Sequence, residues 1–462
     1  MKLDRHSLGE ICDKVGGIIR TGPFGSQLHE SDYKEEGIPV VMPKNIVDGK
    51  ISTEGIARIS DDDVARLAQH KLHRGDIVYG RRGDIGRRAL IAAKEDGWIC
   101  GTGCLHISLG NTLLYPLFLY YFLGQPRVIK WICNQAIGAT LPNLNTEIIR
   151  STQILYPSLL TQRKIAAILS AYDDLIENNK RRIAILEEMA QSLYSEWFVY
   201  FRFPGHEKKR LVESELGLIP EGWEVVKLRD VSSLINRGIS PKYDNASENL
   251  VINQRCIRHG KLNLDETRRH LTRVSNEKLV RFGDVLVNST GIGTLGRVAQ
   301  IYRDIPNCTV DSHVTIVRPR DRAIIDYFGY YLQSLQPLFD SLGVGSTGQT
   351  ELSRESIASS NFLLPPNNVQ EAFAIFVSPM RRNVIQMLTK NANLRQTRDL
   401  LLPKLISGEV DVEGLEIHIE GGTYESDSNK LPEISSRNET VHYSDLSAHV
   451  LCGRHLLAHE ST

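Results

Sequence analysis

A loop rich in arginine is the first part of this 462-residue chain whose residue types and spacing could do chemistry. It directly follows the strand-like run Ile77–Tyr79 and places four arginines around two glycines. Glycine lets a backbone approach a phosphate closely, and the guanidinium fork matches the guanine edge in the major groove of DNA. The candidate contact residues are Arg81, Arg82, Arg87 and Arg88. The loop therefore favours contact with a nucleic acid, and a solvated basic hairpin is the alternative.

A second loop has the same place after a strand but different chemistry. Residues 288–297 replace charge by amides and hydroxyls, which suit adenine or mixed readout. Its candidate contact residues are Asn288, Ser289, Thr290, Thr294 and Arg297. The loop also contains a formal G-x-G-x-x-G at Gly291, Gly293 and Gly296, but a dinucleotide fingerprint needs a helix to start there. A strand-like run follows instead, so we expect base contacts rather than a bound nucleotide.

Other polar residues in loops share this base-reading chemistry. Amides and hydroxyls beside arginine or lysine can bind base edges, but they are also ordinary turn residues, so both interpretations stay open. In the first half of the chain these candidates are Lys44, Asn45, Thr102 and Thr140. In the second half they are Asn253, Gln254, Arg255, Ser346, Thr347 and Gln349.

A catalytic set is not found in the sequence. There is no phosphate-binding G-x-x-x-x-G-K-[ST] loop and no H-E-x-x-H zinc helix, and Leu364–Asn367 has the wrong flanks for an amino-methyltransferase motif. Cys100 with Cys104, and Cys452 with His455, each resemble half a metal site without the other half. We therefore expect no catalytic residue, metal or cofactor in this chain, and expect any chemistry to come from partners.

The elements that position the two loops belong to an internal repeat. Matching residues recur in order at offsets between 207 and 210. The matches pair Gly75-Asp76 with Gly283-Asp284, His106 with His313, Tyr120-Tyr121 with Tyr330-Tyr331, and Pro157 and Gln162 with Pro365 and Gln370. In both copies short strand-like runs are interrupted by a helix, expected near Pro116–Ile132 and Ile325–Phe339. One mixed α and β domain used twice suggests two related but different targets.

Each copy ends in a long amphipathic segment. No Gly or Pro interrupts the 37 residues Thr161–Trp197, which predicts a continuous helix of about 55 Å. Steps of seven reach mostly apolar residues in both segments. They pass through Ile165, Tyr172, Asn179, Leu186 and Leu193 in the first segment, and through Phe373, Met380, Met387, Leu394 and Leu401 in the second; Asn179 is the polar exception. We expect an intramolecular antiparallel coiled coil with pseudo-two-fold symmetry and one domain at each end. Asn179 is either a buried amide that selects register or a solvated edge residue, and Pro379 should kink or restart its helix.

Composition permits a DNA partner without requiring one. The formal net charge is zero, but from Glu413 onward nine acidic residues face three basic ones, so residues 1–412 are mildly basic. Seven cysteines without a framework indicate reduced thiols in the cytoplasm. The N-terminus lacks the apolar core of a signal peptide, and the most hydrophobic stretch, Leu113–Leu123, is too short to span a bilayer. Residues 409–462 are acidic and aperiodic, which predicts a flexible tail.

Several runs resemble the specificity subunits of type I restriction-modification systems. They are Asp173–Asn179 with Arg181-Arg182-Ile183, Glu196-Trp197-Phe198, Arg202–His206, Leu394–Leu405 with Ser407-Gly408, and Gly22–Ser26. The resemblance implies a non-catalytic subunit whose two target-recognition domains bind the halves of a bipartite, asymmetric double-stranded DNA site. It also implies two methyltransferase subunits that use S-adenosylmethionine to methylate adenine, and restriction subunits that use ATP and Mg²⁺ to cleave DNA.

The expected domain plan combines the repeat with this resemblance. It comprises target-recognition domain 1 (1–158), a central spacer helix (159–204), target-recognition domain 2 (205–366), a C-terminal spacer helix (367–408) and the tail (409–462).

Overall fold

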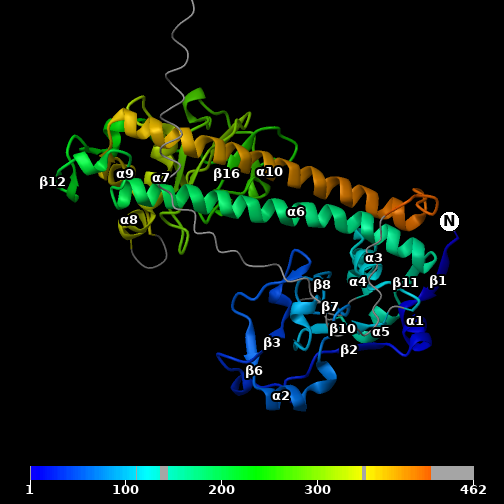
Figure 1. Cartoon of the computed structure of the whole chain (residues 1–462). Helices are drawn as coiled ribbons and strands as arrows, with labels where there is room; N and C mark the ends of the chain where they lie inside the picture. Colours follow the sequence, from blue (N-terminus) through cyan, green and yellow to red (C-terminus); the bar gives the residue numbers. More distant parts are fainter. Residues whose placement is uncertain (1, 111, 136–143, 346–349, 418–462) are drawn as a thin grey trace, which may run out of the picture. The chain divides into compact units, whose positions relative to one another are not determined.

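One mixed α/β domain is built twice in this chain, and each copy is followed by one long helix. The computed structural model describes residues 2–110, 112–135, 144–345 and 350–417 (Figure 1). The predicted fold class, two similar mixed domains joined by two long antiparallel helices, is confirmed.

The first copy contains two small sheets and two strand pairs. The order is β2-β10-β7-β8 in the antiparallel sheet and β6-β3-β9 in the mixed sheet, in which β3 and β9 are parallel; β4 pairs with β5, and β1 with β11. The strands are β1 (Asp4–Ser7), β2 (Ile18–Thr21), β3 (Ile38–Val41), β4 (Ile46–Val47), β5 (Lys50–Ile51), β6 (Ala57–Ile59), β7 (Ile77–Gly80), β8 (Arg88–Leu90), β9 (Ile99–Cys100), β10 (Cys104–Ser108) and β11 (Gln153–Tyr156). The helices are α1 (Leu8–Val15), α2 (Asp61–Arg66), α3 (Pro116–Leu123), α4 (Pro126–Gln135) and α5 (Thr146–Arg150).

The second copy repeats this topology sheet for sheet. Its orders are β15-β23-β20-β21 and β19-β16-β22, with β16 and β22 parallel, and its pairs are β17-β18 and β14-β24. The strands are β14 (Glu224–Lys227), β15 (Ser232–Arg237), β16 (Leu250–Ile252), β17 (Ile257–Arg258), β18 (Lys261–Leu262), β19 (Arg268–Arg269), β20 (Val285–Asn288), β21 (Val298–Gln300), β22 (Cys308–Val310), β23 (Val314–Pro319) and β24 (Asn361–Leu364). The helices are α7 (Ile325–Ser334), α8 (Gln336–Ser341) and α9 (Arg354–Ser359). A hairpin of β12 (Leu211–Ser214) and β13 (Gly217–Pro220) precedes this copy.

The central strand of each larger sheet separates two apolar cores. In β7, Ile77 and Tyr79 point into the core that contains α3, and Val78 points into a second core shared with β3 and β9. In β20, Val285 points into the core that contains α7, and Leu286 points into a second core shared with β16 and β22. A strand buried on both faces must be apolar throughout, which explains the uninterrupted hydrophobic run before each candidate loop.

The register of the sheets corrects one match within the repeat. In the first copy His106 of β10 lies opposite Val78, and in the second copy Ile316 of β23 lies opposite Leu286. His106 therefore corresponds to Ile316, and its predicted match to His313 is wrong. The second loop is two residues longer than the first, and this insertion shifts the sequence offset beyond it.

Each predicted middle helix is two helices. α3 ends at Leu123 and α4 begins at Pro126, while α7 ends at Ser334 and α8 begins at Gln336, next to Pro337. Proline lacks an N–H and clashes with the preceding turn, so the chain restarts a helix there.

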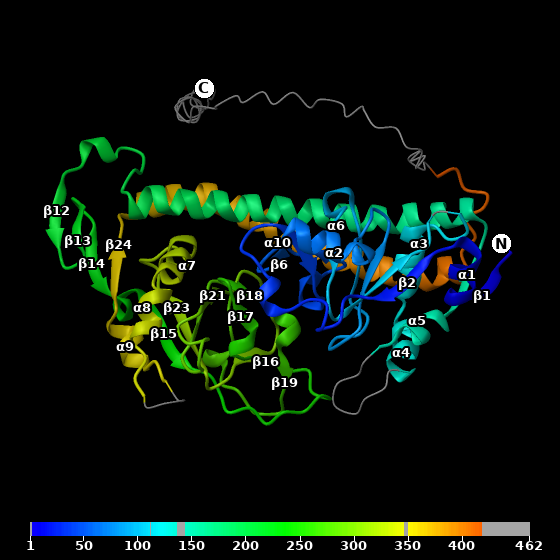
Figure 2. The same ribbon diagram turned by 90° about the horizontal axis from the view of Figure 1, so that it is seen from below.

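The two long helices lie side by side and run in opposite directions (Figures 1 and 2). They are α6 (Leu159–Tyr194), which continues into a π-helical turn at Ser195–Val199, and α10 (Asn367–Ser407). Lys164 near the start of α6 donates to the carbonyl oxygen of Glu413, and Trp197 after its end contacts the ring of Phe373. The predicted antiparallel pair is therefore confirmed.

A buried seam with a seven-residue period holds this pair together. The buried residues of α6 at that spacing are Gln162, Leu169, Ile176, Ile183 and Ala190, followed by Trp197. The predicted series through Ile165 and Asn179 flanks this seam. Asn179 donates from Nδ2 to Oδ1 of Asn391 at 2.8 Å, and Asn391 is buried, so the amide is a register-selecting pair rather than a solvated residue.

Pro379 does not end its helix. α10 continues from Asn367 to Ser407 through this residue, so the predicted restart is wrong. Phe373 and Val377 before the proline are buried against the second domain, and this packing compensates for the one backbone hydrogen bond that proline removes.

Each end of the helix pair belongs to the core of one domain. The first domain's core includes Ile165 and Leu169 of α6 with Leu405 and Ile406 of α10. The second domain's core includes Tyr194 of α6 and Phe373 of α10. Each core thus joins the beginning of one helix to the end of the other, as a pseudo-two-fold requires.

The segment after α10 is attached to the first domain, which corrects the predicted start of the tail. Val412 is 1% exposed in the first domain's core, and Lys164 also donates to the carbonyl oxygen of Leu415. Acidic composition alone predicted flexibility from residue 409 and missed this buried valine. Residues 418–462 lie outside the described part of the chain. Among the described helices, none is long and apolar enough to cross a membrane.

Candidate nucleic-acid interface

Three chain segments of the first domain meet beside the end of β7, and we call them loop cluster 1: residues 42–45, 80–87 and 101–103. The amide of Arg81 donates to the carbonyl oxygen of Gly103 at 2.9 Å, and the amide of Gly101 donates to that of Val41 at 2.9 Å. Leu144, which follows the undescribed residues 136–143, donates its amide to the carbonyl oxygen of Arg81. Backbone hydrogen bonds therefore bring together candidate residues far apart in sequence.

The second domain repeats this backbone frame in loop cluster 2, residues 253–256, 288–297 and 311–313. The amide of Ser289 donates to the carbonyl oxygen of His313 at 2.8 Å, and the amide of Leu352 donates to that of Ser289 at 2.9 Å. The amide of Asp311 donates to the carbonyl oxygen of Ile252. These bonds equate Arg81 with Ser289.

Equivalent positions in the two clusters carry different side chains. Extending the backbone frame pairs Arg82 with Thr290, Lys44 with Arg255, Arg87 with Arg297 and Gly103 with His313. The clusters therefore offer one scaffold with two sets of contact groups, as two different half-sites would require.

The candidate side chains divide into exposed and buried groups. Those exposed to solvent are Lys44, Arg82, Arg87 and Arg255, and those half-buried are Arg88, Thr102, Gln254, Thr290, Thr294 and Arg297. Those buried are Asn45, Arg81, Asn253, Asn288 and Ser289. Thr140, Ser346, Thr347 and Gln349 lie outside the described residues. Base contact by any of them stays a prediction.

The buried candidates hold the loops in shape. Asn45 accepts the amide of Met42 at 3.1 Å, and Asn253 accepts the amide of Arg255 at 2.8 Å, so each closes a tight turn. Asn288 donates from Nδ2 to the carbonyl oxygen of Gln254 at 3.1 Å, which joins two segments of loop cluster 2. These side chains position the exposed ones beside them.

The arginines of loop cluster 1 have unequal surroundings. Arg81 donates from Nε to the carbonyl oxygen of Leu144, and burial lowers its guanidinium pKa. Arg88 donates to the carbonyl oxygen of Tyr120 at 2.7 Å and stacks on that ring, so it joins β8 to α3. Arg87 pairs with Asp84 at 2.9 Å. Arg82 is exposed and forms no ion pair with any described residue, so it is the guanidinium best placed to reach a ligand.

Loop cluster 2 contains a residue that the motif search missed. His313 is exposed, and its Nδ1 lies 2.6 Å from the hydroxyl of Thr290. The buried Asp311 accepts the amide of His313, and burial raises the pKa of this carboxyl group. Histidine and threonine side by side offer both donors and acceptors without a fixed charge. The false match of His313 to His106 concealed its place in the loop.

A buried aspartate that is paired with a basic side chain supports the strands beneath each cluster. Asp76 lies 2.7 Å from Nε2 of His106, and Asp284 forms two bonds with Arg318 at 2.7 and 2.8 Å. Burial raises the pKa of Asp76, but its bond to His106 and the attraction of that ring outweigh this effect, so the net shift is downward. Both pairs join the strand that leads into the arginine-rich or amide-rich loop to the neighbouring strand.

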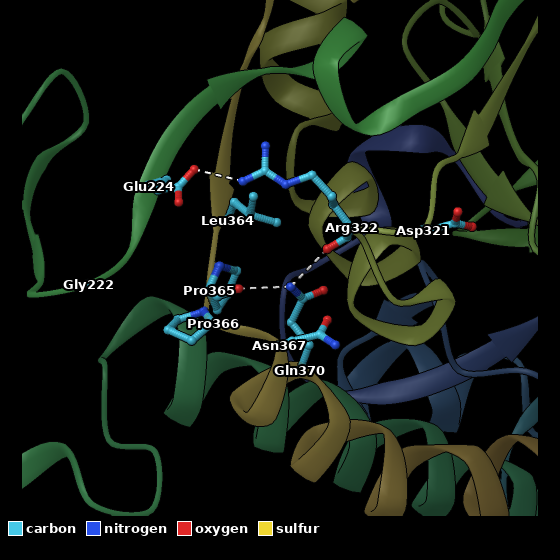
Figure 3. Close-up of a pocket in the computed structure, with 9 residues that line it drawn as sticks. All are labelled: Gly222, Glu224, Asp321, Arg322, Leu364, Pro365, Pro366, Asn367 and Gln370. Atoms are coloured by element: carbon cyan, nitrogen blue, oxygen red, sulfur yellow. Dashed lines mark hydrogen bonds and ion pairs between the residues drawn. The ribbon is translucent and has the colours of Figure 1, made fainter.

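A repeated glutamine fastens each domain to its long helix. In the second domain Gln370 donates to the carbonyl oxygens of Pro365 at 2.8 Å and Arg322 at 3.3 Å, in a pocket whose lining includes the Arg322–Glu224 ion pair (Figure 3). In the first domain Gln162 donates to the carbonyl oxygens of Pro157 and Leu113, both at 3.0 Å. The repeated proline and glutamine are therefore an anchor.

Charged residues make further contacts between each domain and the helix pair. Tyr121 of α3 donates to Asp173 of α6 at 2.6 Å, and Arg398 of α10 pairs with the same carboxylate. In the second domain Asp326 of α7 accepts from Ser378 of α10 at 2.6 Å and pairs with Arg381. Each loop cluster is thus carried by a domain that is bonded to the long helices.

Metal-ligating clusters and disulfides are absent from the described residues. No group of three or more His, Cys, Asp or Glu residues there could hold a metal ion, and the six cysteines they include are free thiols.

These features define a duplicated recognition protein, in which two copies of one loop-bearing domain share an antiparallel helix pair. The chain belongs to the family of type I restriction modification DNA specificity domains, whose model matches residues 5–188 and 220–396.

Individual relatives are similar over most of their length. The chain is 25% identical over 400 residues to the type I restriction enzyme MjaIX specificity subunit of Methanocaldococcus jannaschii, covering 83% of this chain and 89% of the relative. It is 22% identical over 430 residues to the EcoBI specificity subunit of Escherichia coli, covering 86% and 85%. The crystal structure of the S subunit from M. genitalium has the same fold, with a TM-score of 0.56 and 15% identity over 88% of this chain and 96% of that one.

Proposed function

We propose that this chain is the specificity subunit of a type I restriction-modification complex and reads a bipartite, asymmetric site in double-stranded DNA. Loop cluster 1 reads one half-site mainly through arginine, and loop cluster 2 reads the other through amide, hydroxyl and imidazole groups beside Arg255 and Arg297. The helix pair sets the distance between them. The carrying observation is that one backbone frame, with different exposed side chains, is fastened to each end of that pair.

The proposed partners supply the chemistry. Two methyltransferase subunits, using S-adenosylmethionine, would methylate adenine in the two half-sites, and restriction subunits, using ATP and Mg²⁺, would cleave unmodified DNA. The specificity chain itself contributes no catalytic residue or cofactor to this scheme; it binds DNA and holds the other subunits. DNA is the target, so the cytoplasm is the proposed site of action.

The test is sequence-specific binding by the assembled complex of this chain with its methyltransferase subunits. Methylated positions in host DNA are mapped by sequencing to obtain the site, and binding to that site is compared with binding to duplexes in which one or both halves are scrambled. We expect each scrambled half to weaken binding separately. An adaptor that bridges proteins without touching DNA would bind all duplexes alike and would lack the negative dependence of log affinity on log salt.

A further inference from the structure

The second domain carries a positively charged strip beside loop cluster 2, which we call the basic edge: Lys242, Arg268, Arg269 and Arg273, with Tyr243 among them. β19 is at the end of the strand order β19-β16-β22 (Figure 2). Arg268 lies opposite Val251 and Arg269 opposite Leu250 of β16. The segment at Tyr243 bridges to His270 on the other side of this strand. All five side chains of the basic edge are exposed.

The first domain has the same edge with the opposite charge. There β6 takes the place of β19, and the amide of Lys34 donates to the carbonyl oxygen of Arg58 as that of Asp244 donates to Arg269. Residues 34–63 contain seven acidic and four basic side chains, whereas the equivalent residues 244–274 contain four acidic and six basic ones. Arg58 takes the place of Arg269 and makes the same bond, from Nη1 to the carbonyl oxygen of Gly37 at 2.8 Å, so this one cation belongs to the shared scaffold. The scaffold does not require the other three cations of the basic edge, and they need another explanation.

Two arginines of the basic edge, Arg268 and Arg269, are held in position with donors to spare. The guanidinium of Arg268 lies 3.3 Å from the centroid of the Tyr243 ring, and Arg269 donates one bond to the carbonyl oxygen of Ser247 at 2.6 Å. None of the four cations forms an ion pair with a described residue. Because a stacked guanidinium keeps its edge free for bidentate bonds, this arrangement suits phosphate oxygens. Its fixed position also reduces the entropy cost of binding.

The basic edge continues directly from loop cluster 2. Asn253 of the cluster donates from Nδ2 to the carbonyl oxygen of Glu266 at 2.9 Å, and Arg268 follows two residues later. At about 3.3 Å per extended residue, the backbone that carries these cations begins within about 7 Å of the Glu266 carbonyl oxygen that the cluster holds. A duplex held by the cluster would therefore bring its backbone to this edge.

We propose that the basic edge binds the sugar–phosphate backbone of DNA that flanks the second half-site. This inference rests on the proposed function and deepens it, because it assigns different kinds of DNA contact to the two domains. The second domain adds a cluster of cations beside its reading loops. The first domain keeps only the equivalent of Arg269, so it lacks such a backbone anchor.

The test measures the salt dependence of DNA binding by the assembled complex. The triple variant R268Q, R269Q and R273Q should reduce the slope of log affinity against log salt by about 0.9 for each phosphate that the protein no longer neutralises. Base preference at both half-sites should stay the same, because binding to phosphate carries no direct sequence information. Lysine at the three positions should restore most of the slope.

The matched control is the equivalent edge of the first domain. K34Q with R58Q removes two cations from the same scaffold and should leave the slope unchanged. An unchanged slope in the folded triple variant, checked by its thermal unfolding, would overturn the inference while leaving sequence-specific binding intact. A loss of preference at one base pair would also overturn it, because these arginines would then bind bases. If the parent complex shows no sequence preference, the proposed function itself fails.

Discussion

Lengthening the helix pair by one seven-residue repeat of its seam tests whether the pair sets the distance between the two DNA half-sites. Asn179 faces Asn391 in the antiparallel pair, so Ile183 lies level with Met387. A seven-residue duplication at this level in each helix preserves the spacing of the buried seam. The domain-to-helix bonds at Asp173 stay with the first domain, and those at Ser378 stay with the second.

The expected displacement follows from the geometry of both helices. Seven residues add about 10.5 Å to the pair and turn its downstream face by only about 20°. On DNA this length is about three base pairs at 3.4 Å each. Three base pairs turn the grooves by about 105° at 10–10.5 base pairs per turn. The second domain would then meet the backbone where it previously met a groove, so the original site should no longer be recognised.

The assay is methylation mapping in a host that carries the variant complex. We expect methylation at the original spacing to disappear and to be replaced by a site with a longer gap or by none. A four-residue insertion is the control, because it adds about 6 Å, turns the face by about 40° and breaks the seam. It should also lower the thermal midpoint. The reasoning is refuted if the seven-residue variant folds, assembles and methylates the original site.

Three further changes test the site and its support. Arg82→Ala should weaken binding to one half-site by about 1–3 kcal/mol with no change in thermal midpoint. Arg81→Ala should also lower the midpoint, because Arg81 is buried. Equal weakening of binding to every DNA sequence would instead identify Arg82 as a phosphate contact. Deleting residues 418–462 should leave the methylated DNA sequence unchanged. Truncation from Glu409 also removes the buried Val412 and should lower the free energy of unfolding by about 2 kcal/mol. A changed methylation sequence after deletion of residues 418–462 alone would contradict the first expectation. Asp76→Asn should make stability depend less on pH in acid. The pKa of Asp76 is lower in the folded protein, so its pairing adds stability above the unfolded pKa, and this stability is lost as pH falls through the folded pKa. If stability falls with pH equally in the variant and the parent, the proposed role of this pair is contradicted.

The sequence was sufficient for the large-scale plan because the plan depends on periodicity. A repeat with steady offsets implies two copies of one domain, and seven-residue steps imply a helix seam. The partner of Asn179 was beyond this reasoning. Asn391 lies outside the seven-residue series traced through Phe373, and one helix does not reveal which face of another will meet it. Only the docked pair identifies the two amides as partners.

Exposure within the loops could not be predicted from the sequence. Arg81 and Arg82 are adjacent and chemically identical, yet one is buried and the other exposed. The difference arises because the backbone of Arg81 bonds to both Gly103 and Leu144, which lie 22 and 63 residues further along the chain. Long-range bonds of this kind determine which side of a loop faces solvent, and local spacing carries no signal of them.

Comparison of the two copies within one chain separates support from recognition. The glutamine anchor and the buried aspartate are the same in both domains; the glutamine fastens the domain to its long helix, and the aspartate joins the strands beneath the loop cluster. Arg82 and Thr290 occupy one position of that backbone frame with different chemistry; Arg82 is exposed, and Thr290 is half-buried beside the exposed His313. If the proposed function holds, a change of half-site preference needs substitution only at the outward positions, because backbone atoms and buried side chains make the hydrogen bonds that hold the loops. The same separation explains how the second domain can carry a basic edge on a strand whose counterpart in the first domain adjoins three consecutive aspartates.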